Sequence, residues 1–208
     1  MMHTSTSARA VWCSALLTAG VVAVLALSGC ASRTPSVVLL SLPLDAPTTS
    51  AQAAPAAQAP TLVVRRVQIP EYLQSIQVRY RSSAQTLAEW PATRWAERLE
   101  VSLTRHLSQQ LNARLPAGSV CDTACAGSPK VSSLQVSYLM LDHVRPQGQM
   151  QAQVHWVLTP ASGDTQASKM GQLTLSEPVQ SDDAPGQAAA MARLNAQLAS
   201  QIAPYLKP

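Results

Sequence analysis

The fold is decided by two alternating stretches, Leu134-Gln135-Val136-Ser137-Tyr138-Leu139-Met140 and Met150-Gln151-Ala152-Gln153-Val154-His155-Trp156-Val157-Leu158. In each stretch apolar side chains recur at every second position, which is the period of a strand with one buried face. The turn-forming run Arg145-Pro146-Gln147-Gly148 lies between them. The pattern therefore predicts a long β-hairpin, with Trp156 packed in the core; the alternative for Trp156 is an aromatic contact with lipid or a partner.

The register of this hairpin places its two histidines. If Val144 pairs with Gln149, then His155 lies opposite Tyr138 and shares the polar face of the hairpin with His143. About five residues of strand, or roughly 16 Å, then separate the two histidines. This separation argues against a shared metal ion, and we expect no metal site.

Shorter strands are expected on both sides of the hairpin. Upstream, Leu62–Ile69 is rich in β-branched residues, and Ile76–Tyr80 alternates, with Thr86–Trp90 as its hairpin partner. Downstream, Lys169–Leu175 predicts one more strand, and the apolar run Val37–Leu42 another. Four arginines fall on the upstream strands and predict either a solvated rim or a surface for an acidic partner or lipid headgroups: Arg65, Arg66, Arg79 and Arg81.

Two amphipathic helices complete the pattern. The first is expected to begin at Pro91 and Thr93 and to end at Pro116 and Gly118, with an apolar stripe at every fourth residue: Trp95, Leu99, Leu103, Leu107, Leu111 and Leu115. The second begins at an N-cap in Asp182-Asp183 and carries a stripe from Met191 to Tyr205. The sum is an α/β or α+β fold, in which two helices cover a mixed or antiparallel sheet of about six or seven strands.

The N-terminus has the layout of a secretory signal. A short start containing Arg9 is followed by the uncharged apolar run Val11–Leu27 and then by Leu27-Ser28-Gly29-Cys30. The alternative is a membrane-spanning helix. The run is at the short end of the spanning range of about 17–25 residues and has no flanking charge to stop transfer, which favours cleavage.

The sequence Leu-Ser-Gly-Cys resembles the lipobox of bacterial lipoproteins. This resemblance implies removal of a signal peptide, residues 1–29, and a covalent lipid on Cys30, with no other cofactor. Ala31 after the cysteine favours the outer membrane by the same resemblance. We expect a short tether at 30–36 and a single domain at 37–208, with an Ala/Pro-rich linker or loop at 43–60.

Composition and motifs argue against an enzyme and against nucleic-acid binding. The net charge is only +4, and no phosphate-binding loop, nucleophile elbow or zinc-protease motif is present. Cys121 and Cys125 flank a short polar stretch. A disulfide is the first interpretation for a secreted chain, whereas the spacing is unusual for zinc and for a redox pair.

Several segments together resemble one family. They are Val64-Arg65-Arg66-Val67-Gln68-Ile69-Pro70-Glu71-Tyr72-Leu73, then Ile76-Gln77-Val78-Arg79, then Arg94-Trp95-Ala96-Glu97-Arg98-Leu99, and a later strand with His155-Trp156. In this order, after a lipobox, they resemble the ABC-type transport auxiliary lipoproteins, the PqiC-like family. The resemblance implies an α/β sandwich without catalytic residues.

The same resemblance implies a function and partners. The protein would face the periplasm, anchored to the outer membrane, and would work with an MCE-domain protein and ABC transporter subunits in lipid transport. Candidate structural or partner-face residues are Pro70, Glu71, Tyr72, Leu73, Arg94, Trp95, Glu97 and Leu99. A homo-oligomer stays open. The alternatives are a stand-alone structural or assembly lipoprotein of the envelope and a periplasmic hydrolase.

Overall fold

Strand β6 (Ser132–Val144) is the centre of the sheet, and with β7 (Gln149–Thr159) it forms the predicted long hairpin. The two strands pair from Val144 with Gln149 onward, as expected. The connection is a short 3-10 turn, η4 (Arg145–Gln147), followed by Gly148 at φ +61°. The left-handed conformation there favours glycine. The computed structural model describes residues 36–43, 61–121, 130–163 and 165–206.

A β-bulge in β6 corrects the predicted register. Between Tyr138 and Met140 the pairing shifts by one residue, so His155 pairs with Ser137, and Tyr138 pairs with Val154. The extra residue, Leu139, is exposed. A bulge exchanges the faces of all the residues beyond it. His143 is therefore buried on the inner face, whereas His155 is exposed on the outer face, and the prediction that they share a face was wrong.

Further pairings complete a sheet of eight strands within the described residues. On one side of the hairpin, β8 (Lys169–Pro178) runs antiparallel to β7. On the other side, β2 (Leu62–Val64) lies parallel to both β6 and β5 (Val120–Cys121). The far end of β6 meets β3 (Gln77–Arg81), which is followed across the sheet by β4 (Leu87–Trp95) and by the edge strand β1 (Val38–Leu40).

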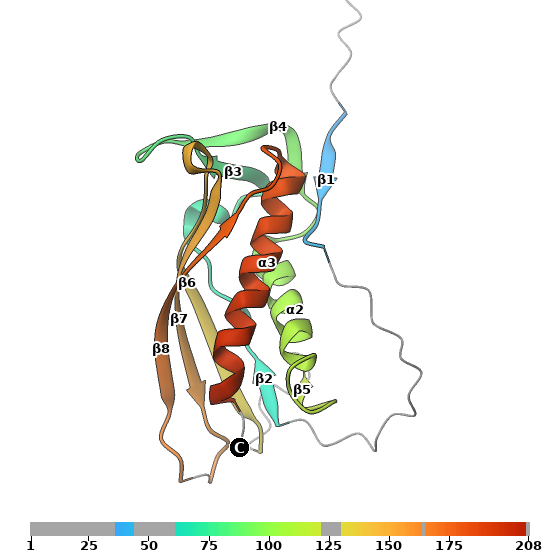
Figure 1. The fold of residues 1–208 in the computed structure, drawn as a ribbon. Coiled ribbons are helices and arrows are strands. Elements are labelled where there is room, and N and C mark those ends of the chain that lie inside the picture. The colour runs from blue at the N-terminus through green and yellow to red at the C-terminus, as the bar shows by residue number, and fades with distance from the viewer. Residues whose placement is uncertain (1–35, 44–60, 122–129, 164, 207–208) are drawn as a thin grey trace, which may run out of the picture. The chain divides into compact units, whose positions relative to one another are not determined.

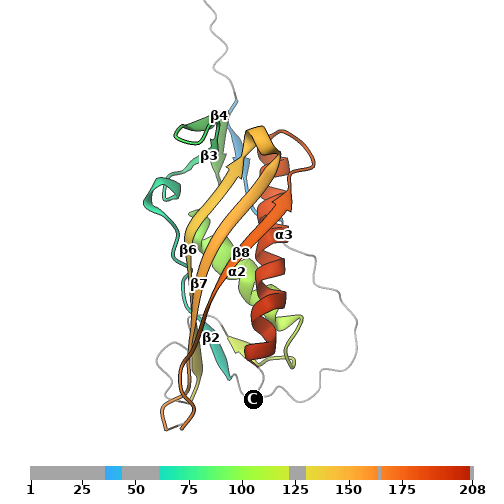
Figure 2. The ribbon, with the colours of Figure 1, turned by 60° about the vertical axis from the view of Figure 1, so that its left-hand side comes forward.

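Two helices cover one face of this sheet. Helix α2 (Leu99–Asn112) packs on β2 and β5, and α3 (Ala184–Ile202) packs on β7 and β8 and on α2. Figures 1 and 2 show α3 running along the concave side of the β6–β8 ribbon, with α2 beside it. Two 3-10 turns, η2 (Glu71–Leu73) and η5 (Ala203–Tyr205), complete the described elements. The predicted fold class is confirmed.

The predicted start of the first helix was wrong. Pro91 and Thr93 lie in β4, and α2 begins only at Leu99. Gln77 pairs with Arg94, and Arg79 pairs with Glu89, so between these two pairs the β4 segment is several residues longer than the β3 segment and forms a bulge. Ala92 lies in this bulge and has φ +48°. A proline is tolerated in a bulge because no ladder N–H is needed there. Trp95 continues the four-residue spacing by coincidence, since it reaches the core from the strand.

The core combines the helical stripes with the inner face of the sheet. The residues predicted for the α2 stripe from Leu99 to Leu111 are at most 2% exposed, and Trp95 and Trp156 are also buried. One buried polar cluster joins the layers: Tyr138 Oη donates to Asn195 Oδ1 (2.9 Å), and Asn195 Nδ2 lies 3.1 Å from both Leu103 O and His106 Nδ1. Buried polar groups need such partners. Burial raises the pKa of Tyr138.

Helix α3 begins as the sequence predicts. The Asp183 side chain accepts from the Gly186 N–H (2.6 Å), and Pro185 lies in the first turn. Cys30, most of the linker at 43–60, and Cys125 lie outside the described residues, so the lipid site and the disulfide stay predictions. Cys121 ends β5. No helix in the described ranges is both long and apolar enough to cross a membrane.

Candidate functional site: the outer face of the sheet and the polar network at its end

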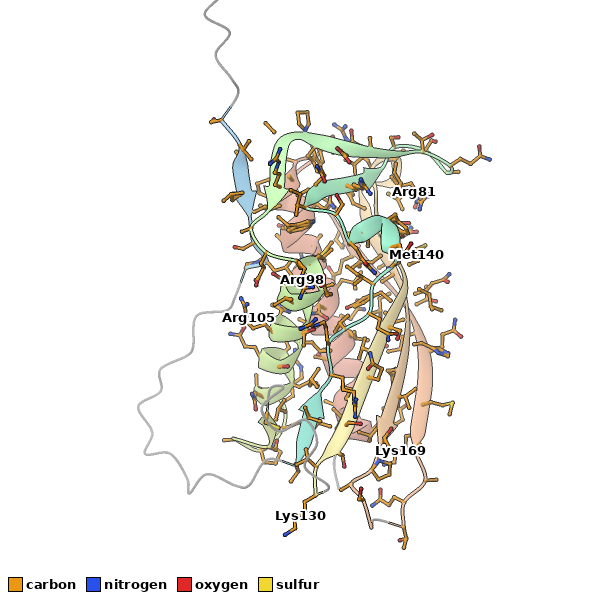
Figure 3. The ribbon with its side chains drawn as sticks, turned by 180° about the vertical axis from the view of Figure 1, so that it is seen from behind. Arg81, Arg98, Arg105, Lys130, Met140 and Lys169 are labelled. Atoms are coloured by element: carbon orange, nitrogen blue, oxygen red, sulfur yellow. The ribbon has the colours of Figure 1, made fainter. Side chains whose placement is uncertain are left out.

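The three strands β6, β7 and β8 turn their second side away from the helices. We call this surface the outer face. We define it by four of its cross-strand rows, whose members pair directly. The rows are Gln135, Val157 and Met170; Ser137, His155 and Gln172; Met140, Gln153 and Thr174; and Asp142, Gln151 and Ser176. Figure 3 views the domain from behind and labels Met140 on β6.

The outer face is almost free of charge. Eleven of its twelve residues are amides, hydroxyls, apolar side chains or a histidine, and the twelfth, Asp142, is buried. Exposed sheets of soluble proteins usually carry lysine and glutamate, whereas the centres of protein interfaces are depleted in both. Met170 in this face is 70% exposed, and the bulge residue Leu139, which pairs with no residue of β7, is 56% exposed. The composition indicates a contact surface.

Asp142 closes one end of the outer face through a buried ion pair. Its Oδ2 accepts from Arg81 Nε (2.8 Å) and is equally close to the second guanidinium nitrogen, while its Oδ1 accepts from Tyr72 Oη (3.0 Å). Burial, followed by the Asp142 charge, raises the pKa of Tyr72 to about 12. The hydrogen bond to Asp142 raises the pKa of Arg81. These three residues tie η2, β3 and β6 together.

A second polar network lies on the inner side of the same end. Gln187 Oε1 accepts from Trp90 Nε1 (2.7 Å), and Gln187 Nε2 donates to Arg79 O (2.8 Å). These bonds fix the amide orientation, so His143 Nδ1, 3.2 Å from the same Oε1, is a donor. The ring of His143 stacks on Trp90 at 6.3 Å between centroids. Burial lowers the pKa of His143.

Arg145 covers this network from the solvent side. Its guanidinium lies 4.8 Å from the Trp90 ring centre and 5.0 Å from that of Tyr80, which is a cation–π arrangement. It also pairs with Asp182, whose Oδ1 is 2.8 Å from Arg145 Nε. That hydrogen bond lowers the pKa of Asp182. The hairpin turn is thereby fastened to the start of α3.

The structure gives the predicted segment Pro70–Leu73 a largely structural position. Pro70 precedes η2, Leu73 is buried, and the Tyr72 carbonyl accepts from Arg79 (2.8 Å). Tyr72 reaches Asp142 as described above, and only Glu71 is exposed. The segment therefore supports the end of β6, and its role as a partner face stays a prediction.

The predicted segment Arg94–Leu99 is brought close to the first one by β3. Arg94 pairs with Gln77 at the start of β3, and the Trp95 N–H donates to Ile76 O (2.7 Å). Trp95 and Leu99 are buried. Glu97 accepts from Ser102 Oγ (2.6 Å), and this hydrogen bond, with the Arg105 ion pair, lowers the pKa of Glu97. Figure 3 shows Arg98 and Arg105 on the α2 side. Of the two charged residues predicted in this segment, Glu97 forms an ion pair, whereas Arg94 is exposed and forms none with the described residues.

The four arginines of the upstream strands divide into two kinds. Arg79 and Arg81 lie in β3 and pair with Glu89 and Asp142. Arg65 and Arg66 are exposed in the irregular segment after β2, so the prediction that they lie on a strand was wrong. A shallow groove of about 520 Å³ lies at this segment, between Arg66–Ile69, Gln74 and Glu100. Within the described ranges no cluster of three or more histidine, cysteine or acidic residues could hold a metal ion.

Sequence reasoning missed the outer face and the network around Asp142. The outer face follows from the pairing of three strands, which a single sequence does not display. One signal was available: the polar positions of the hairpin, among them Gln135, Gln151 and Gln153, are amides where charged residues are usual. The Arg81–Asp142 pair joins residues 61 positions apart.

The fold has counterparts among solved structures. One, described as an uncharacterized protein, superposes with a TM-score of 0.66 at 20% identity and covers 83% of this chain and 99% of its own. A second, a Xanthomonas campestris protein assigned to the DUF330 family, has a TM-score of 0.54 at 15% identity, with coverages of 82% and 91%. At these identities the likeness concerns the fold. The comparison with curated protein sequences gave no match.

The comparison with protein families assigns the chain to one family. The family described as "ABC-type transport auxiliary lipoprotein component" matches residues 41–203, which include the whole sheet from β2 to β8 and both helices. The match spans well over half of the chain and agrees with the resemblance of its sequence segments. The chain therefore belongs to the ABC-type transport auxiliary lipoprotein component family.

Proposed function

We propose that this protein is an outer-membrane-anchored, periplasm-facing lipoprotein that serves as the non-ATPase auxiliary component of an MCE/ABC-type lipid transport system. The observation that carries the proposal is the family match over residues 41–203. The lipobox ending at Cys30 supports the anchor, and Ala31 supports the outer membrane. The protein contributes docking and has no chemical step of its own.

The outer face is the surface that suits the transport partner. It is uncharged apart from the buried Asp142, and its other eleven residues can form hydrogen bonds or apolar contacts without the desolvation of an ion. It is also rigid, because the β6–β8 ribbon is packed on α3 and closed at one end by the Arg81–Asp142 pair. A preformed surface loses little conformational entropy on binding.

The proposal is tested by placing charge on the outer face. In cells that carry Gln153→Lys together with Thr174→Lys, crosslinked membranes should yield several-fold less of the MCE-domain partner than wild type, because two cations would be desolvated in the contact. The matched control is Asn112→Lys, at the exposed end of α2. Both variants are checked for wild-type abundance and membrane fractionation.

Loss of the protein should sensitise cells to detergents and other membrane-active compounds. If the double lysine variant yielded as much crosslinked MCE partner as the wild type, the outer face would not be the surface that binds this partner. Normal barrier function in the deletion strain, with no MCE or ABC subunit in the crosslinked material, would instead favour the stand-alone structural or assembly lipoprotein.

A further inference from the structure

Strand β1 exposes an unusual run of apolar side chains. Val37, just before the strand, and Val38 and Leu39 within it are 48%, 52% and 66% exposed, so apolar side chains are uncovered on both faces of this edge strand. Leu40 and Leu42 anchor the strand by entering the core at 9% and 3% exposure. The described domain has only four other large apolar side chains with comparable exposure, and they are scattered. Soluble proteins rarely leave such a run uncovered.

The strand also lies at the edge of the sheet. It pairs with β4 alone among the described strands, so its second edge presents unpaired backbone groups. Edge strands of this kind usually carry a lysine or a proline that prevents association. The described residues 36–43 carry no charged side chain, and Arg94 on the neighbouring strand pairs with Leu39 in the register. Arg94 is exposed and has no carboxylate partner among the described residues.

The position of the run along the chain, close to Cys30, argues that a membrane surface covers it. Val37 follows Cys30 by seven residues, and a fully extended chain spans at most about 3.3–3.6 Å per residue. The run is therefore held within about 25 Å of the lipid attachment site. An acylated cysteine brings the membrane surface to that distance whatever path the intervening residues take. Apolar side chains beside an arginine are the combination that binds at the boundary of headgroups and acyl chains.

We propose that Val37, Val38 and Leu39, with Arg94 beside Leu39, form a second contact with the bilayer that carries the Cys30 lipids. The inference rests on the lipidation in the proposed function and deepens it. The apolar side chains enter the headgroup region, and Arg94 lies at the phosphates. The acyl chains set the distance of the domain from the membrane, and β1 sets its orientation. Figure 1 shows β1 beside the first half of α3 and away from β2 and β5.

The test uses the acylated full-length protein, purified from membranes and reconstituted into vesicles of phosphatidylethanolamine and phosphatidylglycerol. An environment-sensitive fluorophore is attached at Val38→Cys and, as the matched control, at Gln172→Cys on the outer face. Cys121 and Cys125 are replaced by serine in both proteins. Headgroup spin-labelled lipid should quench the label at position 38 about two-fold or more and should leave the label at 172 nearly unchanged.

Adding Leu39→Asp and Arg94→Glu should return the label at position 38 to the emission of a water-exposed site, while the protein still floats with the vesicles. Equal, weak quenching at both positions in floating wild-type protein would overturn the second contact and leave the anchor intact. Crosslinking between Val38→Cys residues of two copies would also overturn it, because a second chain would then cover β1. Failure to float would contradict the lipid anchor itself, and the second contact with it.

Discussion

Replacing Asp142 by asparagine tests the buried ion pair that closes the outer face. The side chain is 2% exposed, accepts one hydrogen bond from Arg81 Nε and one from Tyr72, and has the second guanidinium nitrogen of Arg81 2.8 Å away. The asparagine side chain would keep an acceptor for Tyr72 but would present its NH₂ group to the N–H groups of Arg81, so a partly buried cation would lose its counter-charge.

The magnitude follows from the burial of the two partners. Removing one partner of a buried pair costs about 3–5 kcal/mol. Arg81 retains 23% exposure and can turn partly toward water, so we expect about 2–3 kcal/mol less free energy of unfolding. The assay is urea denaturation of the mature chain carrying Cys30→Ser, monitored by tryptophan fluorescence, because Trp90 and Trp95 lie near this end of the sheet.

The matched control is the exposed pair of Arg79 with Glu89, whose carboxylate side chain is 48% exposed. Glu89→Gln should cost only about 0–1 kcal/mol, because solvent screens such pairs. If Asp142→Asn cost no more than Glu89→Gln, the pair would not hold β3, β6 and η2 together, and the rigidity argued for the outer face would lose its support.

Three further perturbations probe the core, the helix cap and the buried histidine. Leu107→Ala, at a fully buried position, should cost about 2–5 kcal/mol in urea denaturation, whereas Leu139→Ala at the exposed bulge should stay within about 0.5 kcal/mol. Asp183→Ala should lower the thermal midpoint, and Asp183→Asn, which retains an N-cap acceptor, should restore most of it. Burial lowers the pKa of His143, so the unfolded chain binds a proton at this histidine more readily than the folded chain does. The free energy of unfolding should therefore fall as the pH drops below about 6.5 and level off below the folded pKa. In denaturation measured as a function of pH, His143→Gln should reduce this fall.

The hairpin and the second helix could be predicted because their signals are long and local. Strict alternation from Met150 to Leu158 leaves one interpretation, and Asp183 with Pro185 marks a helix start through chemistry within one turn. The four-residue spacing of α2 was also interpreted correctly from Leu99 onward. Its start was misplaced because Pro91 suits a bulged strand as well as a first helical turn, and the neighbouring strands decide between them.

The candidate site depended on contacts that sequence order conceals. The bulge at Leu139 falls in the apolar run Leu139-Met140-Leu141, where one extra residue leaves no visible break, yet it moves His143 into the core. Tyr72, Arg81 and Asp142 meet only after β3 joins the end of β6. The predicted segments around Pro70 and Arg94 lie close together, but the structure shows most of their side chains supporting the fold.

The central claim is that a lipid on Cys30 ties this domain to a membrane, and metabolic labelling with an alkyne fatty acid measures it most directly. In a strain that expresses the natural chain, the mature protein should incorporate the label and sediment with outer-membrane vesicles. The Cys30→Ser chain should incorporate none and should retain its signal segment or appear in the soluble periplasmic fraction. Processing and membrane fractionation of Cys30→Ser identical to the wild type would contradict the account.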